Sequence, residues 1–204
     1  MARPLVLACG ALVAELRAVL HANGLSDEVE VRYLPANLHN RPQGIVPGLR
    51  ELLAVHDPDG DRPVLIGYAD CGTGGGLDAL LAERPNLHRL PGNHCYEFYA
   101  GTPAFDALHE AELGTFFLTD FLAKHFEALI WQGLGLDRHP ELLSLYFGNY
   151  TRLVLLSQTE DEAVVTAGRL AAAQLGLRFE HVHVGLTPFG DAVAVALRST
   201  GKVA

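Results

Sequence analysis

The stretch Val64–Tyr99, VLIGYADCGTGGGLDALLAERPNLHRLPGNHCYEFY, decides how the chain is organised. It opens with the short apolar run Val64–Tyr68, which is typical of a buried strand. The run ends at Asp70-Cys71 and is followed by the glycine-rich segment Gly72–Gly76, where the backbone can turn sharply and expose its N–H groups. A second cysteine, Cys95, follows in another glycine-led turn.

The same order of strand, cysteine, glycine and helix occurs near the amino end of the chain. There, Leu5–Ala8 reads as a strand and Cys9-Gly10 precedes a helical stretch. This recurrence places two cysteines directly after two predicted strands, and it is the main functional clue in the sequence.

Strands and helices alternate along the rest of the chain. Expected strands are Leu5–Ala8, Val29–Leu34, Val64–Tyr68, Leu87–Leu90, Arg152–Ser157 and Arg178–Val184, the last with His181 and His183 on the same face. Expected helices are Leu12–Ala22, Ile45–Val55, Leu77–Glu83, Ala104–Ala111, Phe116–Phe126, Glu141–Phe147 and Thr159–Leu175. This alternation predicts one α/β domain over residues 1–204, with a mostly parallel sheet covered by helices on both faces in a Rossmann-like, three-layer arrangement.

Composition excludes several classes of protein. The chain has 204 residues, 49% of them hydrophobic and 19% charged, which is enough apolar material for a substantial core. A net charge of −9 and only two lysines argue against nucleic-acid binding. Because no apolar run approaches the roughly 20 residues that cross a bilayer, we expect no membrane association. With no room for a signal peptide before the first strand, a cytoplasmic location and reduced cysteines are expected, and the apolar composition permits a homodimer.

The predicted topology gathers polar residues at one edge. Ligands of parallel α/β sheets bind outside the carboxyl ends of the strands. Cys9, the His39–Arg41 loop, Asp70-Cys71 and Gln158 all come just after predicted strands. We therefore expect these residues to converge on one rim.

Three cysteines on separate loops suit a metal centre. Cys9, Cys71 and Cys95 could hold three corners of an iron–sulfur cluster and leave one iron open to substrate. They could equally hold zinc with an open fourth position. Because the chain has no paired CxxC signature of structural zinc, the cluster is the favoured cofactor and zinc the alternative.

Two readings without metal stay open at this point. Cys71 and Cys95 could form a two-thiol acid/base pair, as in cofactor-independent amino-acid racemases, with Asp70 and His94 tuning them. That reading gives Cys9 no role. Alternatively, the three thiols are inert core residues, since free cysteine is often buried.

Neighbouring polar residues predict a small anionic substrate. Arg41 could clamp a carboxylate or a phosphate, with Asn40 beside it. Thr73 and the N–H groups of Gly74 and Gly75 offer a further anion site, although the loop lacks the lysine of a nucleotide P-loop. Asp70, His94 and His39 are the candidate catalytic residues.

Blocks spread over the chain, from about Leu5 to Gly185, resemble the domain-of-unknown-function 1638 family of prokaryotes. They are Leu7–Ala11, Tyr33–Ala36 with Leu38–Pro42, Tyr68–Gly75, His94–Phe98, Gly114–Phe121 and Gly133–Asp137. The family name implies no activity. Members that resemble this chain are often found beside corrinoid-dependent methyltransferases, which implies a part in one-carbon or methyl transfer. The resemblance therefore adds a corrinoid or methyltransferase protein as an expected partner, and a non-catalytic accessory role as a further alternative.

Overall fold

The computed structural model describes residues 3–199, which form two compact units: residues 3–98 with 187–199, and residues 99–186. Each unit has its own all-parallel sheet, ordered β2-β1-β3-β4 in the first and β5-β6-β7 in the second. The α/β class with parallel sheets and covering helices is therefore confirmed. The strands form two sheets where we expected one, and a single domain stays a prediction. Among residues 3–199, no helix combines the length and apolar character needed to cross a bilayer.

The first unit alternates strands with helices. Its strands are β1 (Leu5–Cys9), β2 (Glu30–Leu34), β3 (Val64–Gly67) and β4 (Leu87–Arg89). Its helices are α1 (Val13–Ala22), α2 (Ile45–His56), α3 (Gly76–Glu83) and α9 (Thr187–Ser199), with the short 3-10 turns η1 (Gly10–Leu12), η2 (Ala36–Asn40) and η3 (Pro42–Gly44). Helix α4 (Cys95–Ala100) begins in this unit.

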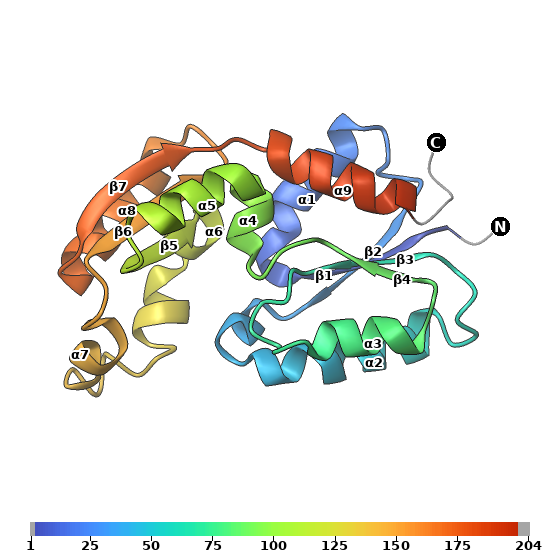
Figure 1. Ribbon diagram of the computed structural model, residues 1–204, viewed down its shortest axis with the longest axis horizontal. Helices are drawn as coiled ribbons and strands as arrows, with labels where there is room; N and C mark the ends of the chain where they lie inside the picture. Colours follow the sequence, from blue (N-terminus) through green and yellow to red (C-terminus); the bar gives the residue numbers. More distant parts are fainter. Residues whose placement is uncertain (1–2, 200–204) are drawn as a thin grey trace. The chain divides into compact units, whose positions relative to one another are not determined.

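Helices cover both faces of the first sheet, with α2 and α3 on one side and α1 and α9 on the other (Figure 1). Leu5 and Leu7 of β1 point to the α2 side, where they join Ile66 and Leu49 in a fully buried apolar cluster. Burying this cluster is the main stabilisation of the layer, because each buried aliphatic side chain contributes about 1.5–3 kcal/mol.

The order of the first sheet creates a switch point between β1 and β3. The chain moves from β1 to β2 on one side and then returns to form β3 on the other side of β1. The loops that leave β1 and β3 therefore diverge, and ligands of open parallel sheets bind in the crevice that results. Cys9 is the last residue of β1, and Cys71 follows β3.

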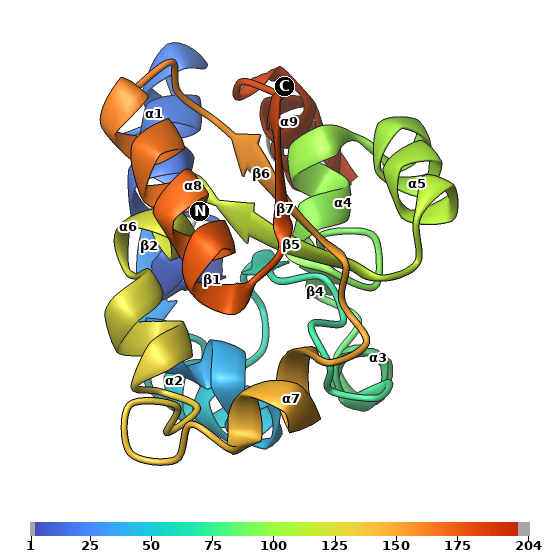
Figure 2. The ribbon, with the colours of Figure 1, turned by 90° about the vertical axis from the view of Figure 1, so that its left-hand side faces the viewer.

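The second unit is a three-stranded parallel sheet with helices on both faces. Its elements are α5 (Thr102–Ala111), β5 (Thr115–Thr119), α6 (Asp120–Lys124), a π-helical turn η4 (Glu127–Trp131), α7 (Leu142–Phe147), β6 (Arg152–Ser157), α8 (Glu162–Leu175) and β7 (Arg178–His183). Phe105 of α5 packs on Phe117 of β5, with ring centroids 5.1 Å apart. Helix α8 covers the opposite face, where Gly168 lies against Leu155 and Phe179 (Figure 2).

Two sequence-based expectations were wrong. Residues 116–126, predicted as one helix, form strand β5 followed by the short helix α6. The aromatic residues matched a helical spacing, but Phe116 and Phe117 point to opposite faces of a sheet that needs both. Gln158 does not share a rim with Cys9, because it follows β6 in the other sheet, where its side chain accepts from the Asp120 N–H at 3.0 Å.

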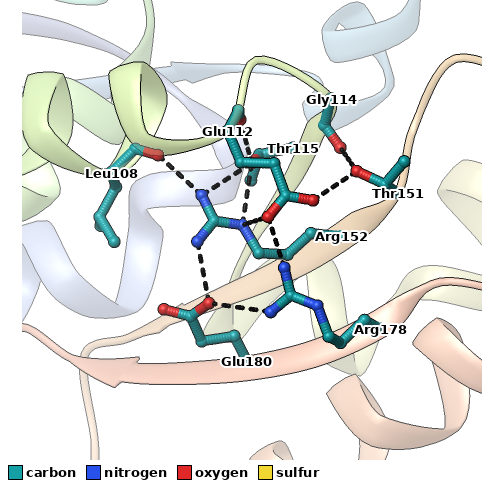
Figure 3. Close-up of polar contacts among 8 residues, drawn as sticks. All are labelled: Leu108, Glu112, Gly114, Thr115, Thr151, Arg152, Arg178 and Glu180. Atoms are coloured by element: carbon teal, nitrogen blue, oxygen red, sulfur yellow. Dashed lines mark hydrogen bonds and ion pairs between the residues drawn. The ribbon is translucent and has the colours of Figure 1, made fainter.

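A charge cluster around the buried Arg152 holds together the amino ends of the strands in the second unit (Figure 3). Arg152, which is 5% exposed, donates to Thr115 Oγ1 at 2.9 Å, to the Leu108 carbonyl at 2.7 Å and to Glu180 at 2.9 Å. Glu112 pairs with both Arg152 and Arg178. Because ligands bind at the opposite, carboxyl ends of such strands, we assign this cluster a structural role.

Gly67 should be intolerant of a side chain. A Cβ added there would lie 2.8 Å from the Ala8 Cβ and 3.2 Å from its Cα, inside the sheet. We expect Gly67→Ala to lower the free energy of unfolding by about 1–3 kcal/mol, measured by urea unfolding followed by circular dichroism.

The matched control is Gly190→Ala in α9 of the same unit. Its added Cβ would have no neighbour nearer than 3.8 Å, and alanine favours the helix by about 1 kcal/mol, so this variant should be neutral or more stable. Equal stability of the two variants would contradict the close packing of β1 on β3.

Candidate functional site

The carboxyl end of β1 places Cys9 beside the chain that leaves β2. The Cys9 Sγ accepts from the Ala11 N–H at 3.4 Å and caps the 3-10 turn η1. Gly10 lies so close to the next segment that an added Cβ would be 2.8 Å from the Leu34 carbonyl oxygen and 3.0 Å from the Ala36 nitrogen. Only glycine fits there, which explains the Cys9-Gly10 pair.

The loop after β3 folds around the Asp70 carboxylate. Asp70 accepts from the Thr73 hydroxyl at 2.6 Å, from the Gly75 N–H at 2.9 Å and from the Gly74 N–H at 3.1 Å. Burial opposes ionisation, but these hydrogen bonds, together with the charge of Arg89, hold the pKa of Asp70 below its usual range. The donors expected to bind a substrate anion are thus already taken by a carboxylate of the chain itself.

This arrangement bears on four of the predicted site residues. Thr73, Gly74 and Gly75 hold Asp70, so binding a substrate through them would require the loop to exchange partners. Asp70 itself is a fully hydrogen-bonded loop anchor in this structure. The substrate-binding and catalytic roles of these residues stay predictions.

The same loop turns Cys71 toward the third cysteine. Among residues 3–199, Cys71 is the only non-glycine residue with a positive φ, at 49°. Its N–H donates to the Asn93 carbonyl at 2.8 Å, and the Asp70 N–H donates to the Gly92 carbonyl at 3.1 Å. These two bonds tie the loop to the turn that carries Cys95.

The thiol groups of Cys71 and Cys95 are hydrogen bonded to each other. A hydrogen bond from the Cys95 side chain lowers the pKa of the Cys71 thiol below its usual value, despite burial. The same interaction, with burial and the charge on Cys71, raises the pKa of Cys95 well above its usual value. Cys71 is therefore the more acidic thiol of the pair, and Cys95 is its hydrogen-bond donor.

Cys9 lies near this pair, with Tyr68 beside it. Burial raises the pKa of the Cys9 thiol, and Cys71 adds to that rise. Tyr68 is 2% exposed, and its hydroxyl forms no hydrogen bond of normal geometry with residues 3–199. Burial and the nearby Cys9 raise the pKa of Tyr68, so its hydroxyl keeps its proton. Sequence reasoning treated Tyr68 only as part of a buried strand and missed its position beside Cys9. The one signal in the sequence was a hydroxyl group in an otherwise apolar run.

The structure thus brings the three predicted cysteines together at the switch point. Within residues 3–199, however, no set of three or more histidine, cysteine, aspartate or glutamate side chains is arranged so that it could hold a metal ion. A third ligand would have to move toward the Cys71–Cys95 pair. Metal binding by the cysteines stays a prediction.

The remaining predicted residues line the same side of the first unit. His39 and Asn40 end the turn η2, and Arg41 separates it from η3, with the His39 and Arg41 side chains exposed. Burial of part of the ring and the nearby charge of His94 lower the pKa of His39. Pro42 lies against the loop that follows β3 and carries Cys71, because a Cβ added to Gly72 of that loop would be 3.5 Å from the Pro42 side chain.

Arg89 supports the turn before Cys95, a role that sequence reasoning missed. Its guanidinium pairs with Asp78 at 2.6 Å and donates to the carbonyls of Leu90 and Gly92 at 2.9 and 3.2 Å. An arginine at the end of a short strand carries no local signal for such a contact.

A family model described as "protein of unknown function (DUF1638)" matches residues 33–193. The chain belongs to this family. The resemblance seen in the sequence is therefore confirmed, and the family description names no activity. No curated protein and no solved structure matches the chain.

The thiol pair predicts an order of chemical reactivity. We expect iodoacetamide at neutral pH to modify Cys71 faster than Cys95, because the pKa of Cys71 is lowered and that of Cys95 is raised. Mass spectrometry of peptides at timed intervals measures this. In Cys95→Ala, the pH midpoint for Cys71 alkylation should move upward, since the stabilising hydrogen bond is lost; an unchanged midpoint would contradict the pairing.

Asp70 predicts a dependence of stability on pH. Its pKa is lowered in the folded state, so its contribution is fully present above the unfolded value of about 4 and is lost as pH falls through the lower folded value. Asp70→Asn should therefore be less stable than the wild type at pH 7, and the difference should shrink in acid. Thermal unfolding at pH 7 and pH 3 tests this, with the exposed Asp27→Asn as the control.

Proposed function

We propose that Cys9, Cys71 and Cys95, the thiol cluster, bind a single soft metal ion such as zinc, and that the protein is a metal-dependent enzyme. A small anionic substrate would occupy the open position of the metal. The contact between Cys71 and Cys95 is the observation that carries this proposal.

Two hydrogen-bonded thiols are suited to bind one zinc ion together. With Zn–S bonds of about 2.3 Å and tetrahedral angles, two ligand sulfurs lie about 3.8 Å apart, close to the separation of hydrogen-bonded thiols. Cys71 has the lower pKa of the pair, and any thiol proton left on either cysteine would be released when the metal binds.

Cys9 is the third ligand in this proposal, and Tyr68 supports it. A shift of Cys9 toward the pair would complete three ligands and leave the fourth position open, as in catalytic zinc sites. The buried Tyr68 hydroxyl keeps its proton and would donate it to the Cys9 thiolate. Such donors to metal-bound ligands strengthen metal binding.

The contact favours one metal ion over an iron–sulfur cluster. In a cluster with one open iron, each cysteine binds a different iron, so the ligand sulfurs stand farther apart than hydrogen-bonded thiols. It also disfavours the two-thiol racemase, because thiols that touch leave no space for a substrate carbon between them.

The substrate class rests on the positive charge of Arg41 and on the imidazole rings beside the cluster. Arg41 is exposed and precedes Pro42, which lies against the loop that carries Cys71. His39 and His94 lie near each other on the same side of the first unit. These groups suit a small carboxylate or phosphate. The link to methyl transfer, a corrinoid or methyltransferase partner, the accessory role and a homodimer stay predictions from the resemblance and the composition.

Metal analysis tests the proposal. We expect the protein, purified without oxygen and loaded with Zn²⁺, to hold one zinc per chain and no acid-labile sulfide. Cys71→Ser and Cys95→Ser should each weaken zinc binding by about 100-fold or more, while His88→Gln on β4 keeps it. Circular dichroism verifies that the variants fold.

Two results would overturn the proposal. One is a wild-type protein that holds no metal after loading while its thiols react freely. The other is zinc binding that survives both cysteine substitutions. Stoichiometric iron with sulfide would replace the single ion by the cluster.

A further inference from the structure

The second unit carries two histidines that meet at one buried hydroxyl. His181 and His183 are two residues apart on β7, so their side chains lie on the same face of the sheet. In the parallel register, Ser157 of β6 lies opposite His183. This is the face that α8 covers. Ser157 is 0% exposed, whereas both histidine side chains are exposed. The expectation from sequence that the two rings share a face is confirmed.

The ring nitrogens converge on a single point. His181 Nε2 is 2.8 Å and His183 Nδ1 is 3.1 Å from the Ser157 Oγ. A hydroxyl has one hydrogen and can donate it to only one of these nitrogens, so the other ring must donate to the oxygen. Ser157 therefore fixes both ring orientations at once, with two nitrogen atoms aimed at the same place.

The surrounding charge favours a cation there. The segment after Ser157 carries the exposed acidic residues Glu160, Asp161 and Glu162. Lys124 lies 3.5 Å from Asp161 and offsets part of this charge. An anion would meet a net negative field at this end of the sheet, whereas a cation is attracted.

We infer that His181 and His183 form a binding site for a divalent first-row transition metal ion. Neutral imidazole is a good ligand for nickel, copper, zinc and cobalt, and two histidines two residues apart on a strand can chelate one ion. Two protein ligands leave the other positions to water or to a small bound molecule. Ser157 is a positioning residue that holds the rings before the ion arrives. As the ion binds, the Ser157 hydroxyl would rotate away, and the ring that donated to it would move its proton to its other nitrogen. This site is independent of the thiol cluster.

Nickel binding tests the site with two independent measurements. In titration calorimetry, His181→Gln and His183→Gln should each weaken the binding of one Ni²⁺ ion per chain by about tenfold or more. The double variant should not bind this ion. Glutamine keeps a hydrogen-bonding group near Ser157, so folding should be retained. In the wild-type protein, Ni²⁺ should broaden the ring-proton NMR signals of His181 and His183 before those of other histidines, which needs no variant.

Matched variants separate this site from the thiols. His125→Gln removes a single exposed imidazole in the same unit and should leave the Ni²⁺ equivalent intact. A Cys71→Ser, Cys95→Ser double variant should also keep it, without thiolate-to-metal absorption, even if the thiol cluster binds nothing. Unchanged binding in the His181 and His183 variants, or broadening centred on other histidines, would overturn the inference.

Discussion

The three hydrogen bonds that the Asp70 carboxylate accepts from its own loop determine the geometry of the candidate site. They close the glycine segment around a single negative charge, so that Thr73, Gly74 and Gly75 point inward. Closing the loop this way leaves Cys71 on the side that meets Asn93. Contact between Cys71 and Cys95 follows from that path. Without the Asp70 carboxylate, the N–H groups of Gly74 and Gly75 would lose their partner in the loop.

Topology supplies the rest of the cluster. In the β2-β1-β3-β4 sheet, the loops after β1 and β3 leave from neighbouring strands in opposite directions. Cys9 thereby reaches the pair from a position more than sixty residues earlier in the chain. Cys95 lowers the pKa of Cys71, Cys71 and Cys9 raise that of Cys95, and Cys71 raises that of Cys9. The fold thus converts three isolated cysteines into one interacting group.

Sequence patterns predicted what depends on local structure and missed what depends on tertiary contacts. Strands such as β3 and β6 were predicted closely, because their apolar runs are bounded by turns. The prediction of a helix over residues 116–126 was wrong because the spacing of the aromatic residues suits a helix locally, while the sheet needs Phe116 and Phe117 on opposite faces. Local sequence also does not show whether the N–H groups of the glycine loop bind a ligand or Asp70. The contact of Ser157 with two histidines likewise depends on the tertiary structure.

The left-handed backbone of Cys71 has a consequence for why a cysteine stands there. A residue with a side chain is disfavoured in this conformation by about 1–2 kcal/mol, and glycine would adopt it freely. Four of the next five residues, Gly72–Gly76, are glycine and the fifth is threonine, so this segment readily uses flexible residues. Steric convenience therefore does not account for position 71. In the proposed metal site, the sulfur atom is the reason for which this backbone strain is tolerated.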